Sequence, residues 1–191
     1  MDSAQINTLC SSNVILRSFY LGVIRWENLK NTEIRFVNIG EFIWINFLNS
    51  HWIVIQKMSD KKLALFDSFG QKYLPRLEVM TRQFKLIMNN KKFEIKFIVP
   101  FNHQLQDKSN LTCGEQSLFF TLYSCAYLLK YRRYIKNYFY KIKRKSEKLR
   151  ITSDQLVWKM IYFDFKFLKR PNIYKVFEWY NTLSKEKYEK R

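Results

Sequence analysis

The chain has 191 residues and carries 34 Lys and Arg against 16 Asp and Glu, a formal net charge of +18. Hydrophobic residues make up 47% of it and aromatic residues 18%, which excludes a disordered tail and predicts one globular domain over residues 1–191. The positive charge is concentrated in residues 130–191, and so large a surplus favours a polyanionic partner such as nucleic acid.

Three cysteines, Cys10, Cys113 and Cys125, form no CxxC pair and no regularly spaced framework. This pattern favours a reducing compartment and argues against a structural zinc site. No signal-peptide pattern opens the sequence, and the longest uncharged apolar-rich run, residues 42–56, is too short and too polar to cross a bilayer. We therefore expect a soluble protein with no metal or small-molecule cofactor and no membrane partner.

The N-terminal part predicts a short helix followed by strands. Residues 2–12 fit a helix that Asp2 or Ser3 caps, and residues 19–23 form an apolar patch that should pack against the core. Strands are expected at residues 36–37 and 42–45, which are rich in β-branched and aromatic side chains.

Two apolar runs, residues 51–55 and 63–67, flank a polar loop and predict a β-hairpin. If the hairpin is symmetric about Ser59, His51 lies opposite Asp67. Directly opposed residues point to the same face of a sheet with their Cβ atoms about 5 Å apart. The register therefore predicts that these two side chains meet at the open end of the hairpin.

The segment after the hairpin predicts one more helix and one more strand. Residues 74–88 have apolar side chains at helical spacing, and two asparagines follow them. Residues 93–99 alternate well enough for a strand, which Pro100 stops.

Residues 113–129 are almost wholly apolar and predict a helix that is buried on most sides. Thr112 and Glu115, at the start of this run, form a capping-box pattern that makes Cys113 the first helical residue. The positive end of a helix favours the thiolate form of a cysteine, which is the nucleophilic form. Most lone cysteines are inert buried residues, so this position alone leaves both interpretations open.

The C-terminal part predicts further helices. We expect the helix at 113–129 to continue into the basic, tyrosine-rich stretch 130–150. Ser153-Asp154 is a pattern that caps another helix to about residue 168, and Pro171 can open the last one.

A nucleophilic cysteine needs a base within hydrogen-bond reach, and the base needs a group that orients it. His51 has Asp67 as its expected partner, whereas His103, the other histidine, lies in a loop without a comparable acid. A strand histidine is more often structural, and Asp67 is also placed to cap the turn at Ser68. The hairpin register by itself leaves the pair undecided.

An oxyanion hole would complete such a site. The backbone N–H at the start of the helix supplies one donor. A side-chain amide in the preceding loop would supply the second, and Gln104, Gln106 and Asn110 are all available there.

Four motifs in order carry a family resemblance: FYLG at residues 19–22, His51-Trp52, FDSFG at residues 66–70, and Gln106 seven residues before Cys113-Gly114. This pattern resembles the adenain-like proteases, the family of the adenovirus maturation protease. The family's acid motif, Phe-Glu-Pro-Phe-Gly, is similar to FDSFG, and its Tyr-Phe-Leu-Gly stretch is similar to FYLG. The resemblance covers roughly residues 15–130.

The resemblance implies an α+β fold, papain-related with permuted order, in which a mixed β-sheet packs against a buried central helix carrying the nucleophile. It implies Cys113 as the nucleophile, His51 as the base and Asp67 as its orienting acid. Gln106 and the Cys113 amide would form the oxyanion hole, and Trp52 would pack beside the imidazole in the cleft.

The function that this family implies is a cysteine endopeptidase, a hydrolase that cleaves viral capsid and core precursors at glycine-containing sites during virion maturation. Such an enzyme would act as a monomer in the virion and the host nucleus, or in the host cytoplasm if the virus replicates there. The single protease domain would consist of a catalytic core, residues 1–129, and a basic helical part, residues 130–191.

Two departures from the family pattern matter. Asp67-Ser68 is closer to the SUMO-specific proteases of the same clan, whose acid is Asp. The family also joins an activating peptide through a cysteine about eighteen residues before the nucleophile, where this sequence has Ile95. An activating peptide would therefore bind here without a disulfide.

Adenain-like enzymes use DNA as a cofactor, and the basic stretch fits that expectation through phosphate contacts and tyrosines that stack on bases. Alternatively, its lysines form a solvated face and its aromatics belong to the core. Cys125 is expected to be an inert core thiol, and Cys10 a surface or packing residue. The candidate nucleic-acid-binding residues are Lys130, Arg132, Arg133, Lys136, Lys141, Lys143, Arg144 and Lys145.

Two other functions remain open. The same chemistry would serve a protease that removes SUMO or ubiquitin-like proteins ending in Gly-Gly. The charge alone would also fit a non-enzymatic, basic nucleic-acid-packaging protein.

Overall fold

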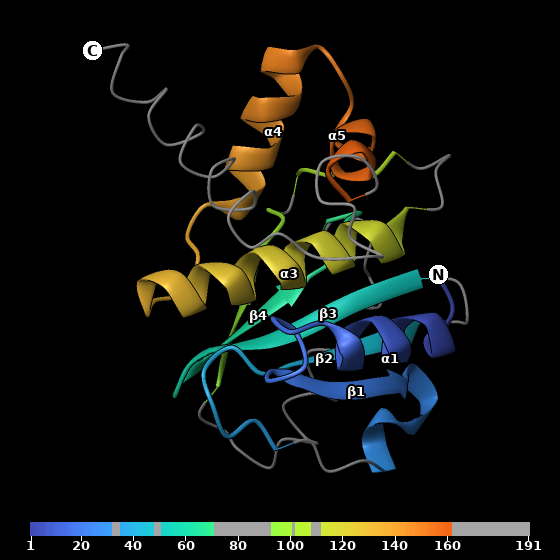
Figure 1. Ribbon diagram of the computed structural model, residues 1–191, viewed down its shortest axis with the longest axis vertical. Helices are drawn as coiled ribbons and strands as arrows, with labels where there is room; N and C mark the ends of the chain where they lie inside the picture. Colours follow the sequence, from blue (N-terminus) through green and yellow to red (C-terminus); the bar gives the residue numbers. More distant parts are fainter. Residues whose placement is uncertain (32–34, 48–50, 71–92, 101, 108–111, 162–191) are drawn as a thin grey trace.

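The computed structural model describes residues 1–31, 35–47, 51–70, 93–100, 102–107 and 112–161, and combines one mixed β-sheet with α-helices in an α+β arrangement (Figure 1). The sheet has five strands in sequence order, and the two edge strands run parallel to their neighbours while the inner three are antiparallel. The strands are β1 (Tyr20–Arg25), β2 (Phe42–Phe47), β3 (His51–Ser59), β4 (Lys62–Phe66) and β5 (Glu94–Phe97). The α-helices are α1 (Ser3–Ser12), α3 (Cys113–Tyr131), α4 (Tyr138–Leu149) and α5 (Ser153–Lys159), and a 3-10 helix, η1, spans Trp26–Asn31.

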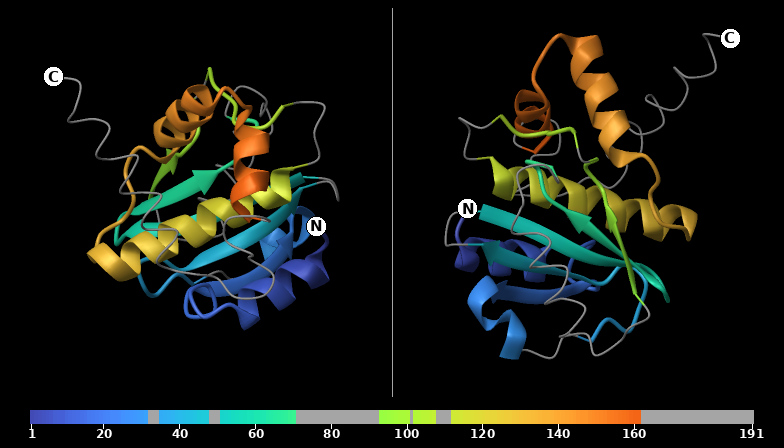
Figure 2. Two further views of the ribbon diagram at one scale, coloured as in Figure 1. Left: turned by 45° about the horizontal axis from the view of Figure 1, so that its top comes forward. Right: turned by 180° about the vertical axis from the view of Figure 1, so that it is seen from behind.

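Both faces of the inner strands are buried. Successive side chains of a strand point to opposite faces, so Trp52 and Val54 of β3 face the helices, while Ile53 and Ile55 belong to a second apolar cluster on the other face. Seen from behind, the sheet lies in front of α3 (Figure 2). The sheet is thus a covered layer, as the apolar composition of residues 51–67 indicates.

Helix α3 is the central packing element of the fold. Fourteen of its residues are buried, including both faces of the stretch from Leu118 to Ala126. Phe120 stacks on Phe66 of β4 with ring centroids 4.5 Å apart and planes inclined by 4°. Burying one such ring contributes about 1.5–3 kcal/mol. The prediction of a buried helix over residues 113–129 is confirmed, and this packing anchors its first residue against β3.

The hairpin forms, but its register differs from the expected one. Strand β3 runs on to Ser59, the turn is Asp60-Lys61, and Ile55 pairs with Leu65. The strands are therefore shifted by two residues relative to a hairpin centred on Ser59. A shift of two keeps every side chain on its expected face, because the side-chain period of a strand is two.

Several expectations at the edges of elements are wrong. Helix α3 ends at Tyr131, because Arg132 adopts a left-handed conformation and its N–H donates to Leu128; α4 starts separately after Asn137. The cap of α5 is Thr152, which exchanges hydrogen bonds with Gln155, instead of Ser153-Asp154.

The N-terminal expectations are met in part. Asp2 caps α1 through a capping box with Gln5, as expected. The apolar patch at residues 19–23 becomes half-buried edge strand β1, whereas residues 36–37 form no strand. There the Val37 N–H donates to the carboxylate of Glu41, 2.6 Å away, so its backbone is satisfied outside the sheet.

Some expectations fall beyond the described residues. The helix at residues 74–88 and everything after residue 161, including the helix opened by Pro171, lie outside them. Within the described part, no helix is long and apolar enough to cross a membrane.

Candidate active site

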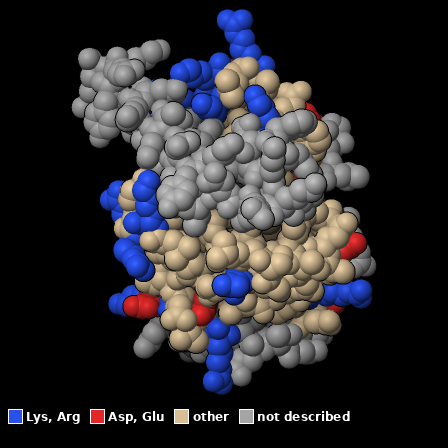
Figure 3. Space-filling model, viewed as in Figure 1, with Lys and Arg blue, Asp and Glu red and all other residues tan. Residues whose placement is uncertain are grey.

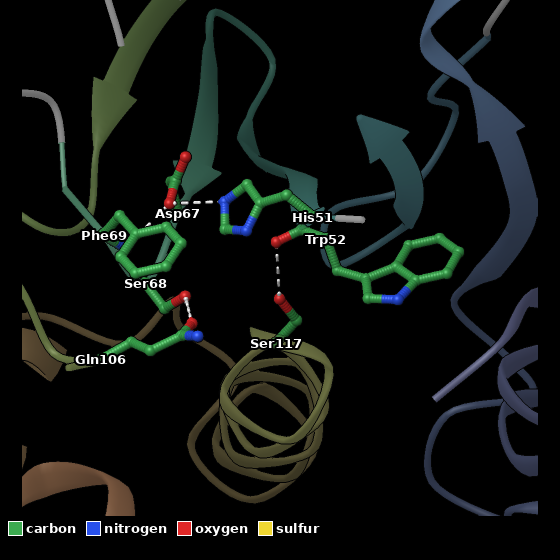
Figure 4. A network of polar contacts seen from close by, with 7 residues as sticks. All are labelled: His51, Trp52, Asp67, Ser68, Phe69, Gln106 and Ser117. Atoms are coloured by element: carbon green, nitrogen blue, oxygen red, sulfur yellow. Dashed lines mark hydrogen bonds and ion pairs between the residues drawn. The ribbon is translucent and has the colours of Figure 1, made fainter. Parts of the chain in front are cut away.

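His51 and Asp67 meet where two neighbouring strands end. His51 is the first residue of β3, and Asp67 follows the last residue of β4. Nε2 of His51 lies 2.9 Å from Oδ1 of Asp67, with side chains 13% and 3% exposed (Figure 4). The turn holds the carboxylate in place, because Oδ1 also accepts the N–H of Phe69 at 2.8 Å. This is the geometry by which an acid fixes the tautomer and orientation of an imidazole.

Phe69 also fixes the plane of the imidazole. Its ring stacks on His51 with centroids 4.9 Å apart and planes inclined by 30°. The next residue, Gly70, has φ +76, and a Cβ there would lie 1.9 Å from the carbonyl oxygen of His103. The segment FDSFG therefore orients the histidine through both its acid and its second aromatic residue, and only glycine fits its last position.

Cys113 is the first residue of α3, and its side chain is 6% exposed. Strand β3 begins beside the start of α3 in both ribbon views (Figures 1 and 2). Burial lowers the pKa of His51, but hydrogen bonds to Asp67 and Cys113, together with the charges of both groups, raise it by more, to about 9. Because this pKa lies above neutral pH, the imidazole is held in its charged form beside the Asp67 carboxylate.

The two ring nitrogens of His51 have different partners. Nε2 is taken by Asp67, which leaves Nδ1 for the thiol side of the ring. Nδ1 is buried and makes no well-aligned hydrogen bond among the described residues. Loose alignment between nucleophile and base is common before a substrate binds.

The N-terminus of α3 differs from the expected capping box. Thr112 is the N-cap residue, as expected, but its side chain makes no capping hydrogen bond. Its hydroxyl donates instead to the carboxylate of Asp154, 2.6 Å away. The oxygen of Thr112 is therefore turned away from the positive end of α3, next to Cys113.

Gln106 is fixed by the residue that follows the acid. Its side chain is 1% exposed, and its Oε1 accepts the Ser68 hydroxyl at 2.6 Å. The N–H of Gln106 donates to the Ser68 carbonyl at 3.1 Å, so both its backbone and its side chain are held. With its oxygen turned to Ser68, its amide nitrogen points into the space between the His51 ring and α3 (Figure 4).

The other two candidate amides differ from Gln106. Gln104 is half-buried, and Asn110 lies outside the described residues. Of the three glutamine and asparagine candidates, Gln106 is the one that the described part of the structure brings to His51 and α3.

Trp52 does not pack beside the imidazole as expected, because neighbouring residues of a strand point to opposite faces. Its ring points away from that of His51 in Figure 4, packs edge-on against Trp44 at 5.9 Å, and donates from Nε1 to the Met1 carbonyl at 2.9 Å. Its Cδ1 would lie 3.5 Å from a Cβ at Gly114, so it packs against the residue after Cys113.

Sequence reasoning assigns no role in the active site to Ser68, Phe69 or Asp154, and it predicts Asp154 only as part of a helix cap. Ser68 and Phe69 lie in the FDSFG segment, whose resemblance to the family motif points only to its acid. A buried Asp so close to the cap of α5 carries no local signal of its long-range partners.

The candidate nucleic-acid-binding residues fall into two groups. Those around the end of α3 are exposed, and those on α4 are exposed or half-buried. Lys and Arg side chains gather along the side where α3 ends and around α4 (Figure 3). The interleaved aromatics are mostly core residues, because Tyr134 and Tyr138 are buried, and Tyr140 is the clearest exposed ring among them at 58%. The eight positions are Lys130, Arg132, Arg133, Lys136, Lys141, Lys143, Arg144 and Lys145.

The other two cysteines are core residues. Burial raises the pKa of Cys10 to about 12, and burial also raises the pKa of Cys125, whose Sγ accepts a hydrogen bond from Gln56 at 3.3 Å. Both thiols are therefore kept protonated and unreactive. Among the described residues, no three His, Cys, Asp or Glu side chains gather as a metal site would require.

No protein-family model matches this sequence, and no curated protein is significantly similar to it. Among solved structures, a weak match is the central domain of the uncharacterized Lpg1148 protein from Legionella pneumophila, with a TM-score of 0.35 and 15% sequence identity. The match covers 53% of this chain and 62% of that chain, less than two thirds of the matched protein. At this level of similarity, the chemistry has to be inferred from the site itself.

Proposed function

We propose that the protein is a cysteine endopeptidase of the adenain-like type, with Cys113 as nucleophile, His51 as base and Asp67 as orienting acid. The observation that carries the proposal is the position of the half-buried imidazole, which lies 2.9 Å from the Asp67 carboxylate and has its pKa raised by both Asp67 and Cys113. A cysteine activated by an oriented base is the general design of thiol nucleophiles.

The reaction follows from these positions. The Cys113 thiolate attacks the scissile carbonyl carbon, and the carbonyl oxygen becomes an oxyanion between the Cys113 N–H and the Gln106 amide. The His51 imidazolium gives its proton to the leaving amine, which departs and leaves a thioester. Water then attacks the thioester while His51 takes its proton, and the acid product and the Cys113 thiolate are released.

The proposed substrates are viral capsid and core precursors with glycine beside the scissile bond. This assignment depends on the family resemblance of the four motifs, of which Asp67 with His51, and Ser68 with Gln106, are joined by hydrogen bonds. A test is digestion of a peptide library containing glycine-rich sites by the wild type and by Cys113→Ala. Cleavage that disappears in Cys113→Ala is expected, and equal cleavage by the two proteins would contradict the proposal.

A second candidate keeps the chemistry and changes the substrate to SUMO or another ubiquitin-like protein. The feature that favours it is Asp67-Ser68, since the SUMO-specific proteases of the clan use Asp as the acid. Fluorogenic substrates made from ubiquitin and SUMO C-termini separate the two. Hydrolysis of these substrates without cleavage of the glycine-containing peptides would favour this candidate.

A polyanion is the proposed partner of the basic surface around the end of α3 and α4, and DNA is its first candidate. The support is a net charge of +18 and the basic side chains that gather where α3 ends and around α4 (Figure 3). Contacts of this kind bind phosphates regardless of sequence and weaken with salt. If the protein only packages nucleic acid, it will bind DNA tightly and Cys113 will show no special reactivity.

A further inference from the structure

The carboxylate of Asp154 joins helix α5 to both sides of the candidate oxyanion hole. The side chain is 4% exposed, and both of its oxygens accept hydrogen bonds. Oδ2 accepts the N–H of Asp107, the residue after Gln106, at 2.7 Å. Oδ1 accepts the hydroxyl of Thr112, the residue before Cys113, at 2.6 Å, and Nε2 of Gln116 at 2.9 Å.

A buried carboxylate is costly unless donors surround it. Here the donors come from the two segments that carry the proposed oxyanion donors, 42 and 47 residues away from Asp154 for Thr112 and Asp107. An asparagine at this position has one acceptor oxygen and one donor group. It can therefore accept hydrogen bonds from only one of the two segments and presents an N–H group to the other. The Thr112 hydroxyl can turn to accept that N–H, but either Nε2 of Gln116 or the N–H of Asp107 loses its acceptor.

The bond to Thr112 changes what the helix end can do. An N-cap threonine ordinarily turns its oxygen over the N–H groups of the first turn. In this structure the hydroxyl of Thr112 donates to Asp154, and the Thr112 side chain makes no capping hydrogen bond to α3. The capping position would put a competing oxygen at the helix end that the oxyanion has to approach.

We infer that Asp154 is a positioning residue for the oxyanion hole, an inference that rests on the proposed cysteine endopeptidase function. By accepting the Thr112 hydroxyl it keeps the Thr112 oxygen away from the N-terminus of α3 beside Cys113. By accepting the Asp107 N–H it keeps Gln106 on the opposite side of the reacting carbonyl. Asp154 touches neither the substrate nor the reacting atoms.

The test compares Asp154→Asn with the double variant Asp154→Asn/Thr112→Val, with kcat and KM measured separately on a cleaved peptide. Asp154→Asn is expected to lower kcat by about tenfold or more with KM nearly unchanged, because the oxyanion donors that Asp154 positions act on the transition state. Thr112→Val cannot cap the helix, so adding it to Asp154→Asn is expected to restore part of kcat. A merely structural role predicts a further loss in the double variant.

Thr152→Ala is the matched control, because it removes the cap of α5 and costs about 1 kcal/mol of stability without touching Asp154 or Thr112. Its kcat should stay near that of the wild type. If Asp154→Asn fails to fold, Asp154→Glu, which keeps the charge but displaces the oxygens, should show the same loss of kcat.

Two results would overturn the inference. A folded Asp154→Asn or Asp154→Glu with wild-type kcat removes the role of Asp154 while the proposed function stands. If the wild type itself cleaves neither glycine-containing peptides nor ubiquitin-like substrates, the proposed function fails and the inference fails with it.

Discussion

The Asp67 carboxylate reaches Nε2 of His51 at 2.9 Å although the two residues are not opposite each other in the hairpin. Continuing the register of β3 and β4 places Asp67 across from Ile53, so the contact runs along a diagonal. Side chains on the same face reach such diagonal neighbours. The turn after β4 completes the contact, because its Phe69 N–H holds Oδ1 toward the ring.

Replacing Asp67 by Asn should shift the pH dependence of the reaction. Asp67 and Cys113 together raise the pKa of His51 to about 9, so the imidazolium that protonates the leaving amine is lost as the pH rises through that value. In Asp67→Asn one of these causes is gone, and the alkaline limb of kcat/KM should move to lower pH. The rate at the optimum should also fall by about 10²-fold or more, since the base is no longer oriented. An unchanged alkaline limb would show that Asp67 does not control this proton.

Gln106 is predicted to act on the transition state. Gln106→Ala should lower kcat by about 10²–10³-fold and change KM little, as removal of one oxyanion donor does. Ser68→Ala, which removes the 2.6 Å hydrogen bond that orients the amide, should give a smaller loss of the same kind. Gln104→Ala is the matched control in the same loop. If Gln104→Ala lowers kcat as much as Gln106→Ala, the choice between the two amides is wrong.

Gly70 is predicted to tolerate no side chain. Its φ is +76, and a Cβ would meet the His103 carbonyl at 1.9 Å, so Gly70→Ala should destabilise the fold by about 3 kcal/mol or more in chemical denaturation. Gly22→Ala is the control, since Gly22 also has a positive φ of +134 but no atom within 4 Å of the added Cβ. Gly22→Ala should cost less. Equal losses would mean that the close approach to His103 is relieved without cost.

The basic surface is predicted to bind duplex DNA through phosphates. Replacing the exposed Arg132, Arg133 and Lys136 by Ala should weaken binding and reduce the slope of log K against log salt by about 0.9 for each phosphate that is no longer neutralised. Replacing Arg17 and Lys61, which are exposed on other elements, should leave the slope unchanged. If the control variant lowers the slope equally, DNA binding depends on the net charge of the protein and not on the surface around the end of α3 and α4.

The elements that sequence reasoning predicts well are those with a strong local pattern. The apolar run after Thr112 predicts the position and burial of α3, and the two apolar runs around residue 59 predict the hairpin and the face shared by His51 and Asp67.

The expected hairpin register is wrong because Lys57 looks like a loop residue. It is in fact 6% exposed, with Nζ 2.7 Å from the Val37 carbonyl and 3.3 Å from Asp60. The Val37 carbonyl, 20 residues away, accepts a hydrogen bond from the Lys57 ammonium group and lets this lysine lie within the strand. No local sequence pattern reveals such a long-range acceptor.

The same limit explains what sequence reasoning misses at the site. Thr112 and Glu115 match a capping box, and the local pattern is sound, but a carboxylate 42 residues later in the chain takes the Thr112 hydroxyl. Ending α3 at Tyr131 likewise depends on the burial of Tyr134 and Ile135 in the common core. Long-range contacts therefore determine both the capping of α3 and the position where it ends. The sequence pattern alone does not show these contacts, although the first of them shapes the candidate site.

The most direct test of the Cys113–His51 pair is the rate at which iodoacetamide alkylates Cys113 at about pH 6, mapped by mass spectrometry with a simple free thiol in the same solution as reference. A thiolate held by the charged His51 should react faster than the reference thiol, and His51→Gln should slow it to the reference rate or below. Cys10 and Cys125 are fully buried and burial raises the pKa of both thiols, so they should stay largely unmodified. If Cys113 reacts no faster than the free thiol and His51→Gln makes no difference, the assignment of a Cys113–His51 catalytic pair is contradicted.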